Sequence, residues 1–101
     1  MEKKRPHYSL DAIRKIVVAR RVNAFTATAL VGAAQLGLSP TEAVEVVLGM
    51  KPNAFYKSMT THADHTTWQD VYHVALKSRR VVYVKVTLRE NGIVVIQFKE
   101  K

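Results

Sequence analysis

The last third of the chain carries the feature that most constrains the fold. From Val82 to Leu88, valine or leucine alternates with Tyr, Lys and Thr, and Asn91-Gly92 follows shortly afterwards. Alternation with a period of two residues is typical of a strand with one buried face. Asn-Gly between two such runs is a strong signal for a hairpin turn. The C-terminal third is therefore predicted to form a β-hairpin.

The length of the hairpin loop decides which residues pair. A two-residue loop would place Lys99 opposite Val84, which mixes polar residues into the apolar face. We favour a three-residue loop of Glu90-Asn91-Gly92 with Gly92 in the left-handed conformation. Facing side chains lie about 5 Å apart, so Tyr83 and Lys99 can then act on one phosphate. The register pairs Tyr83 with Lys99, Val84 with Phe98, Lys85 with Gln97, Val86 with Ile96 and Leu88 with Val94.

The first half of the chain reads as helices. Ser9 is a good N-cap for an amphipathic helix over residues 9 to about 20, and Thr26 can cap a second helix that Gly37 stops. Ser39-Pro40-Thr41-Glu42 combines a capping box with proline at the first helical position, and Gly49 ends that third helix. Between the first two helices, residues 22–25 are expected to form a short strand.

The composition changes from alanine-rich helices to strand-forming residues after Lys51-Pro52-Asn53. Residues 55–61 read as a strand. In residues 66–76 the apolar residues fit helical spacing, while the aromatic content also suits a strand, and we favour a short helix. The sequence thus predicts an α+β fold, in which helices from the N-terminal half pack on an antiparallel β-sheet.

Composition and charge limit the function classes. A chain of 101 residues, 48% of them hydrophobic, is expected to be one domain over residues 1–101. Sixteen Lys and Arg against eight Asp and Glu give a net charge of +8, which favours nucleic acid over a generic basic surface or an acidic protein partner. The chain has no cysteine, a charged start and no apolar run of ~18 residues. We expect a cytoplasmic protein.

Two segments resemble a known family. The uncharged, aromatic-rich run from Phe55 to Tyr72 and the ending Phe98-Lys99-Glu100-Lys101 are similar to the signature segments of the MqsR toxins. The resemblance implies a RelE-like toxin fold. It also implies a sequence-selective, ribosome-independent endoribonuclease (mRNA interferase) of a type II toxin-antitoxin system, which cuts near GC-containing triplets without a metal or another cofactor.

The resemblance also implies site residues and partners. By motif, the residues implicated in cleavage fall on Lys57, Gln69, Tyr83 and Lys99. We expect Lys57 and Lys99 to neutralise phosphate charge, Tyr83 to transfer a proton and Gln69 to orient the substrate. The partners implied are single-stranded mRNA and an MqsA-like antitoxin with a zinc-binding region and a helix-turn-helix region. Candidate RNA-binding residues are Tyr56, Lys85, Arg79 and Arg80.

Several further residues have two interpretations. His62, Asp64 and His65 could form a metal site or a general acid-base pair. Two histidines three apart in a turn make a weak metal signal, and we favour a structural turn. Trp68, Tyr56 and Tyr72 are candidate stacking platforms, with core packing at least as good an interpretation for Trp68. There is no glycine-rich phosphate loop, since the four glycines are expected to end elements or make turns. The rival function is a non-catalytic nucleic-acid-binding regulator.

Overall fold

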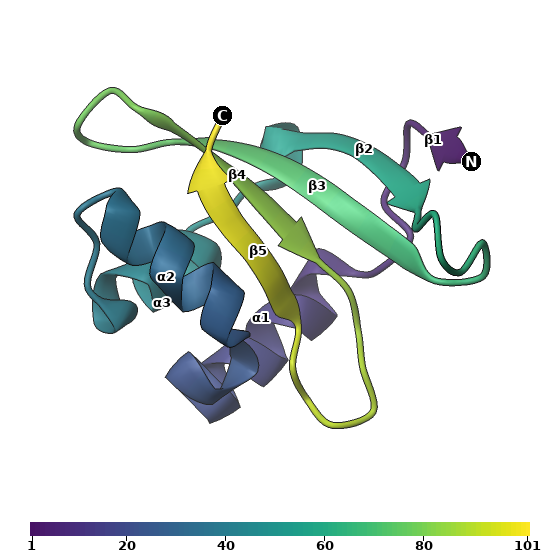
Figure 1. Cartoon of the computed structure of the whole chain (residues 1–101), viewed down its shortest axis with the longest axis horizontal. Coiled ribbons are helices and arrows are strands. Elements are labelled where there is room, and N and C mark those ends of the chain that lie inside the picture. Colours follow the sequence, from purple (N-terminus) through teal and green to yellow (C-terminus); the bar gives the residue numbers. More distant parts are fainter.

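Three α-helices and an antiparallel sheet form two layers in the computed structural model of the chain, which describes all of residues 1–101 (Figure 1). The helices are α1 (Leu10–Arg20), α2 (Ala27–Gln35) and α3 (Pro40–Leu48), with short 3₁₀ helices at Arg21–Ala24 and Pro52–Ala54. The strands are β1 (Glu2–Lys3), β2 (Phe55–Thr60), β3 (Trp68–Ala75), β4 (Val81–Val86) and β5 (Val95–Glu100). The predicted α+β fold is confirmed.

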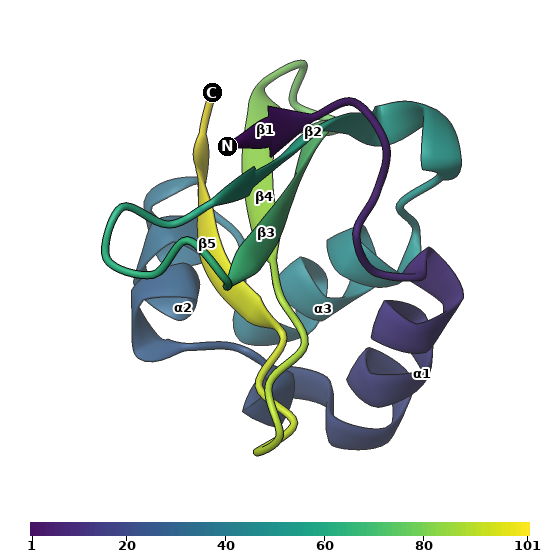
Figure 2. The ribbon, with the colours of Figure 1, turned by 90° about the vertical axis from the view of Figure 1, so that its right-hand side faces the viewer.

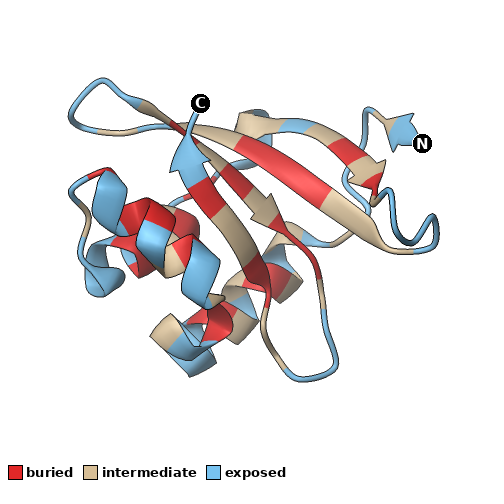
Figure 3. Ribbon diagram, in the orientation of Figure 1, coloured by how far each residue is buried: buried red, intermediate tan, exposed pale blue.

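All three helices pack on one face of the sheet, and the other face has no helix over it (Figure 2). The strands are ordered β1-β2-β3-β4-β5, as in the chain. Val82, Val84 and Phe98 are fully buried and share one core cluster with residues of the helices. Figure 3 shows buried bands on β4 and β5. No helix has the length and hydrophobicity needed to cross a membrane.

The helix starts agree with the sequence. The hydroxyls of Ser9 and Thr26 accept hydrogen bonds from the backbone of the first turns of α1 and α2. At α3, Ser39 Oγ accepts from Glu42 N at 3.1 Å, and Glu42 Oε1 accepts from Ser39 N at 2.9 Å. The predicted capping box is therefore present. It satisfies two backbone donors that would otherwise lack a partner.

Residues 68–75 form a strand, so the helix expected in this region is wrong. β3 is the longest strand and pairs antiparallel with β2 on one side and β4 on the other. Pairing on both sides satisfies its backbone groups, and tertiary context of this kind overrides a local helical pattern. The alternation places Asp70 and Tyr72 toward the helices and Gln69, Val71 and His73 on the opposite face.

The β4–β5 register is confirmed near the middle of the strands and wrong near the loop. Tyr83 pairs with Lys99, Val84 with Phe98 and Lys85 with Gln97, as predicted. A bulge then pairs Val86 with Val95 instead of Ile96. β4 ends at Val86 and β5 begins at Val95, so the loop is longer than three residues. Gly92 has the expected positive φ, at 80°.

The reason for the bulge lies in residues 24–26. Val94 N donates to Ala24 O at 2.8 Å, and Thr26 N donates to Val95 O at 3.0 Å. These bonds hold Val94 and Val95, both fully buried, against the segment before α2. That segment is not the short strand expected over residues 22–25: it is a 3₁₀ helix followed by a single bridge from Phe25 to Val95.

Gly32 lies in the middle of α2, so the expectation that every glycine ends an element or makes a turn is wrong there. A Cβ atom at Gly32 would lie 1.7 Å from the carbonyl oxygen of Phe98. The missing side chain therefore lets α2 pack directly against the backbone of β5.

Replacing Gly32 by alanine should lower the free energy of unfolding by about 2 kcal/mol or more, because the backbone of β5 has to move away. Urea unfolding followed by circular dichroism measures this change. Gly49→Ala is the matched control: Gly49 has right-handed φ, and a Cβ atom added there would meet nothing closer than 3.4 Å. The control should stay within about 1 kcal/mol of the parent. Equal loss in both variants would contradict the close packing.

Candidate functional site

The face of the sheet that points away from the helices carries most of the residues expected at the site. We call this surface the open face. Because side chains alternate along each strand, the residues whose neighbours are buried in the core point the other way. The open face therefore carries Lys57 of β2, Gln69, Val71 and His73 of β3, Tyr83 and Lys85 of β4, and Gln97 and Lys99 of β5.

Two rows of cross-strand neighbours cross this surface. In the first row, Val71 pairs with Lys57 on one side and with Lys85 on the other, and Lys85 pairs with Gln97. Val71 is fully buried but is not part of the core cluster, so the long side chains around it cover it. The first row thus has a small apolar floor between two lysines.

The second row is a series of rings that ends in a lysine. A bulge in β2 brings Tyr56 beside His73, and their ring centroids lie 4.3 Å apart at 20°. The His73 and Tyr83 rings follow at 5.8 Å and 40°. Lys99 Nζ lies 5.3 Å from the centroid of the Tyr83 ring, and Lys85 Nζ lies 5.7 Å from it. The three rings therefore share one strip with the ammonium groups of Lys85 and Lys99.

The lysines of the open face differ in their electrostatic environment. Lys57 Nζ donates a hydrogen bond to Glu2 Oε1, and this bond raises the pKa of Lys57. Burial lowers the pKa of Lys85, and the positive charges of Lys99 and Lys57 lower it further. No acidic side chain forms an ion pair with Lys85 or Lys99. Lys85 and Lys99 therefore offer positive charge without a counter-charge.

The N-terminal arm forms one border of this surface. β1 pairs with β2, which brings Glu2 next to Lys57. Lys3 Nζ lies 4.1 Å from the Trp68 ring, and His7 stacks on the same ring at 5.3 Å. Trp68 is thus half-buried against the arm. It is part of neither the core nor the open face.

Most of the predicted site residues lie together. Lys57, Tyr83, Lys85 and Lys99 occupy the two rows, and Tyr56 adjoins them. Gln69 lies further along β3, on the same face, where it pairs with Met59.

Arg79 and Arg80 lie outside the rows, in the exposed turn between β3 and β4. Arg80 Nε is 3.6 Å from Glu100 Oε2. Tyr72, a candidate stacking platform, is only 1% exposed and packs in the core, so that interpretation is wrong.

Sequence reasoning missed two residues of the open face, His73 and Gln97. His73 shares its face with Gln69 only if residues 68–75 form a strand. The helix expected there does not place the two residues on one sheet face. Gln97 lies opposite Lys85 in the predicted register, but the resemblance implies no role for it. Alternation along β3 is the signal that finds His73.

The loop between β2 and β3 is ordered by Asp64. Its carboxylate accepts from Thr66 N at 2.8 Å and from the hydroxyls of Thr66 and Thr67 at 2.5 and 2.6 Å, and these bonds lower the pKa of Asp64 to about 2. No three His, Asp or Glu side chains converge as metal ligands. The contacts of Asp64 thus agree with the structural interpretation of this turn.

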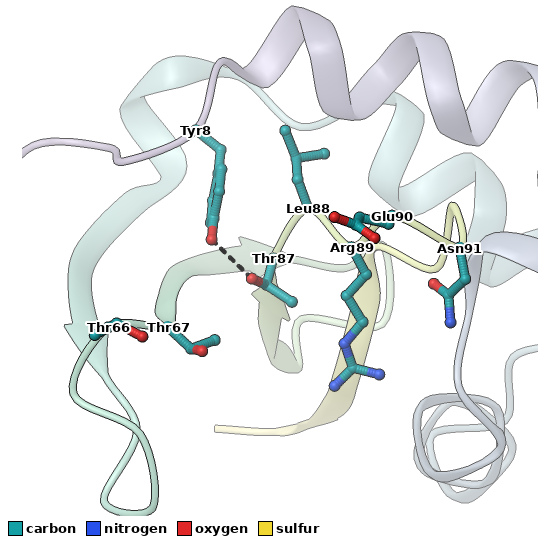
Figure 4. Close-up of a pocket in the computed structure, with 8 residues that line it drawn as sticks. All are labelled: Tyr8, Thr66, Thr67, Thr87, Leu88, Arg89, Glu90 and Asn91. Atoms are coloured by element: carbon teal, nitrogen blue, oxygen red, sulfur yellow. Dashed lines mark hydrogen bonds between the residues drawn. The ribbon is translucent and has the colours of Figure 1, made fainter.

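A polar groove of about 630 Å³ lies at the end of the sheet where β3 begins and β4 ends (Figure 4). Tyr8 crosses it and its hydroxyl lies 2.9 Å from Thr87 Oγ1. Arg89 extends from the β4–β5 loop and has no acidic partner. The groove is lined by Tyr8, Thr66, Thr67, Thr87, Leu88, Arg89, Glu90 and Asn91.

Comparison with known proteins agrees with this geometry. Residues 5–100 match the family described as "Motility quorum-sensing regulator, toxin of MqsA". The chain belongs to the MqsR toxin family. It is 43% identical over 101 residues to the "mRNA interferase toxin MqsR" of Escherichia coli (strain K12), and the match covers 100% of both chains. The resemblance seen in the signature segments is therefore confirmed, and the architecture is consistent with a RelE-like toxin fold.

The electrostatics of the open face can be tested without a substrate. Lys85 should titrate at a lower pH than Lys57, because Lys85 is half-buried beside like charges whereas Lys57 is paired with Glu2. Removing a neighbouring positive charge favours the protonated form, so Lys99→Gln should raise the pKa of Lys85. NMR titration of ¹³C-methylated lysines measures both values. Lys15→Gln, on the exposed side of α1, is the control and should change neither. An unchanged Lys85 pKa in Lys99→Gln would contradict the arrangement.

Proposed function

We propose that this chain is a sequence-selective endoribonuclease toxin that cuts messenger RNA without the ribosome and belongs to a type II toxin-antitoxin system. The main support is that Lys57, Tyr83 and Lys99, three of the residues implicated by motif, lie on one face of the sheet. Spread positive charge is enough for binding alone. A polar constellation of this kind is what cleavage needs.

The proposed mechanism uses the 2′-hydroxyl of the RNA as the nucleophile and no metal. Cleavage of this type requires cations for the charge that develops on the phosphate and groups that transfer protons. Lys57 and Lys99 neutralise the phosphate. Burial raises the pKa of Tyr83, so its phenol keeps its proton at neutral pH and can donate it to the leaving oxygen. Gln69 orients the substrate from the end of β3.

The substrate that fits best is single-stranded. Cutting beside chosen bases requires bases that are unstacked and readable. Tyr56 is 46% exposed and offers an aromatic surface for stacking. Lys85 provides a further cation beside the site, and Arg79 and Arg80 extend the positive surface into the turn between β3 and β4.

The preference for GC-containing triplets requires groups that read base edges. The polar groove supports this preference, because Arg89 and Asn91 carry the donors and acceptors that suit bases. Trp68 and Thr67 directly precede Gln69 in the chain, so the groove adjoins the end of the open face. We infer that bases next to the cut site enter this groove.

The proposed partner is an MqsA-like antitoxin with a zinc-binding region and a helix-turn-helix region. The family description names MqsA as the partner of these toxins. The net charge of +8 suits an acidic partner, and β5, an edge strand of the sheet, suits capture by strand addition. We infer the cytoplasm as the compartment, since that is where messenger RNA is exposed.

The deciding experiment is incubation of the purified chain with a defined single-stranded RNA, followed by mapping of the cut ends. We expect discrete cuts that persist in the presence of EDTA. Lys57→Ala and Lys99→Ala should each slow cleavage by roughly 10²-fold or more, because each removes charge stabilisation of the transition state. Both variants should remain folded by circular dichroism, since a partly exposed lysine adds little stability.

Lys15→Ala removes the same charge from the exposed side of α1 and should cut like the parent. Activity that EDTA abolishes and a divalent ion restores would refute the metal-free mechanism. RNA binding without any cleavage would support the rival function, a non-catalytic regulator.

Arg89→Ala tests the groove separately. If bases bind there, this variant should redistribute the cuts among sequences while the total rate falls much less than in Lys57→Ala. Sequencing of the 5′ ends from a long unstructured RNA measures the distribution. Lys57→Ala should slow every cut by a similar factor and leave the distribution unchanged. An unchanged cut pattern in Arg89→Ala would show that the groove does not read bases.

A further inference from the structure

His73 is a titratable side chain on the open face to which the resemblance assigns no role. It projects from β3 directly opposite Tyr83 of β4. Its ring stacks on Tyr56 at 4.3 Å and lies 5.8 Å from the ring of Tyr83. Since Tyr83 in turn contacts Lys99, His73 lies in the middle of the second row.

The residues implicated by motif do not include a group suited to accept a proton. Lysine and tyrosine side chains ordinarily lose their protons only near pH 10. The pKa of Lys57 is raised further by its hydrogen bond to Glu2, and that of Tyr83 is raised by burial. The amide of Gln69 does not titrate. Attack by a 2′-hydroxyl nevertheless requires a base to take its proton.

The polar edge of the His73 imidazole is available to a substrate. Neither ring nitrogen has a hydrogen-bond partner in the protein, and neither is a buried atom left unsatisfied, so both reach solvent. The His73 ring stacks on Tyr56 of β2, and the Tyr83 ring of β4 lies beside it at a tilt of 40°. The ring is therefore held in place while its polar edge remains free.

The surroundings of His73 also keep the imidazole neutral. Burial lowers its pKa below the ordinary value of 6.5, and the positive charge of Lys101 lowers it further. No carboxylate is among the groups that shift it. A neutral imidazole can accept a proton at pH 7. The groups around it are Tyr56 of β2, Tyr83 of β4, Lys101 after β5 and Lys51, which lines a cavity with His73, with Lys57, Lys85 and Lys99 also on the open face.

We propose that His73 is the general base of the cleavage reaction, an inference that rests on the proposed ribonuclease function. Its ring nitrogen takes the proton of the 2′-hydroxyl as the 2′-oxygen forms a bond to phosphorus. The bond from phosphorus to the 5′-oxygen breaks, and the leaving oxygen takes the proton of the Tyr83 phenol. The products are a 2′,3′-cyclic phosphate and a 5′-hydroxyl. The imidazolium then gives its proton to water, and the phenolate regains one.

If His73 is the base, the cleavage rate depends on the protonation state of its ring. His73 works only when it is unprotonated, so kcat/KM should rise with pH through the pKa of His73 and level off above it. Because that pKa is lowered, the rise should be centred below pH 6.5. Protonation below that point adds a positive charge beside several lysines and removes the base.

The experiment compares the parent with His73→Asn and His62→Asn over pH 5 to 8 on the defined RNA. Asparagine keeps a polar side chain but cannot act as the base, so His73→Asn should cut about 100-fold or more slowly at pH 7 and lose the acidic limb. His62 is exposed in the β2–β3 loop, and its variant should keep the parental rate and profile. In the full-length parent, the NMR titration of the His73 ring should give the same pKa as the acidic limb.

The outcomes separate this inference from the proposed function. If the parent cuts RNA and His73→Asn keeps the parental rate and pH profile, the role of His73 is overturned and the proposed function is not. An acidic limb whose pKa differs from that of the His73 ring also overturns that role, a result that does not depend on the variant folding. A parent that cuts no RNA overturns both the proposed function and the role of His73.

Discussion

A buried carboxylate, that of Asp70, holds together the elements that build the site. Asp70 is fully buried on the helix side of β3. It accepts hydrogen bonds from Ser58 Oγ at 2.6 Å, His7 N at 3.0 Å and Tyr8 N at 2.9 Å. A buried charge without such partners would be strongly destabilising. The network therefore binds β2, β3 and the N-terminal arm together, although these segments lie far apart in the sequence.

The position of the arm determines what surrounds the open face. With His7 and Tyr8 held by Asp70, β1 lies beside β2 and places Glu2 on Lys57. Tyr8 also reaches across the polar groove, where its hydroxyl bonds to Trp68 O at 3.0 Å and to Thr87. The carboxylate on the helix side of the sheet thus shapes both the open face and the groove. Asp70 lies within the signature run, but its role could not be predicted from the sequence, because its backbone partners are more than sixty residues away.

The sequence predicted β4 and its pairing better than it predicted β3. In β4 apolar and polar residues alternate cleanly, and the central pairs from Tyr83–Lys99 to Lys85–Gln97 follow from that alternation. The bulge at Val95 depends on bonds to Ala24 and Thr26, which no local pattern shows. β3 carries apolar residues on both faces, since Val71 is buried beneath lysines and Tyr72 in the core. The spacing of its apolar residues therefore does not distinguish a strand from a helix, and the place of His73 on the open face could not be predicted.

The open face gathers Lys57, Lys85 and Lys99 with only one carboxylate, Glu2, paired to them. Like charges this close repel each other, and a bound phosphate relieves that repulsion. We expect RNA to bind on this face and not over the helices. The most direct test is the NMR shift of valine methyl groups on addition of single-stranded RNA with 2′-deoxy sugars at the cut positions. Val71 and Val81 should shift, while Val18 and Val31, exposed on α1 and α2, should not. Shifts confined to Val18 and Val31 would contradict the account.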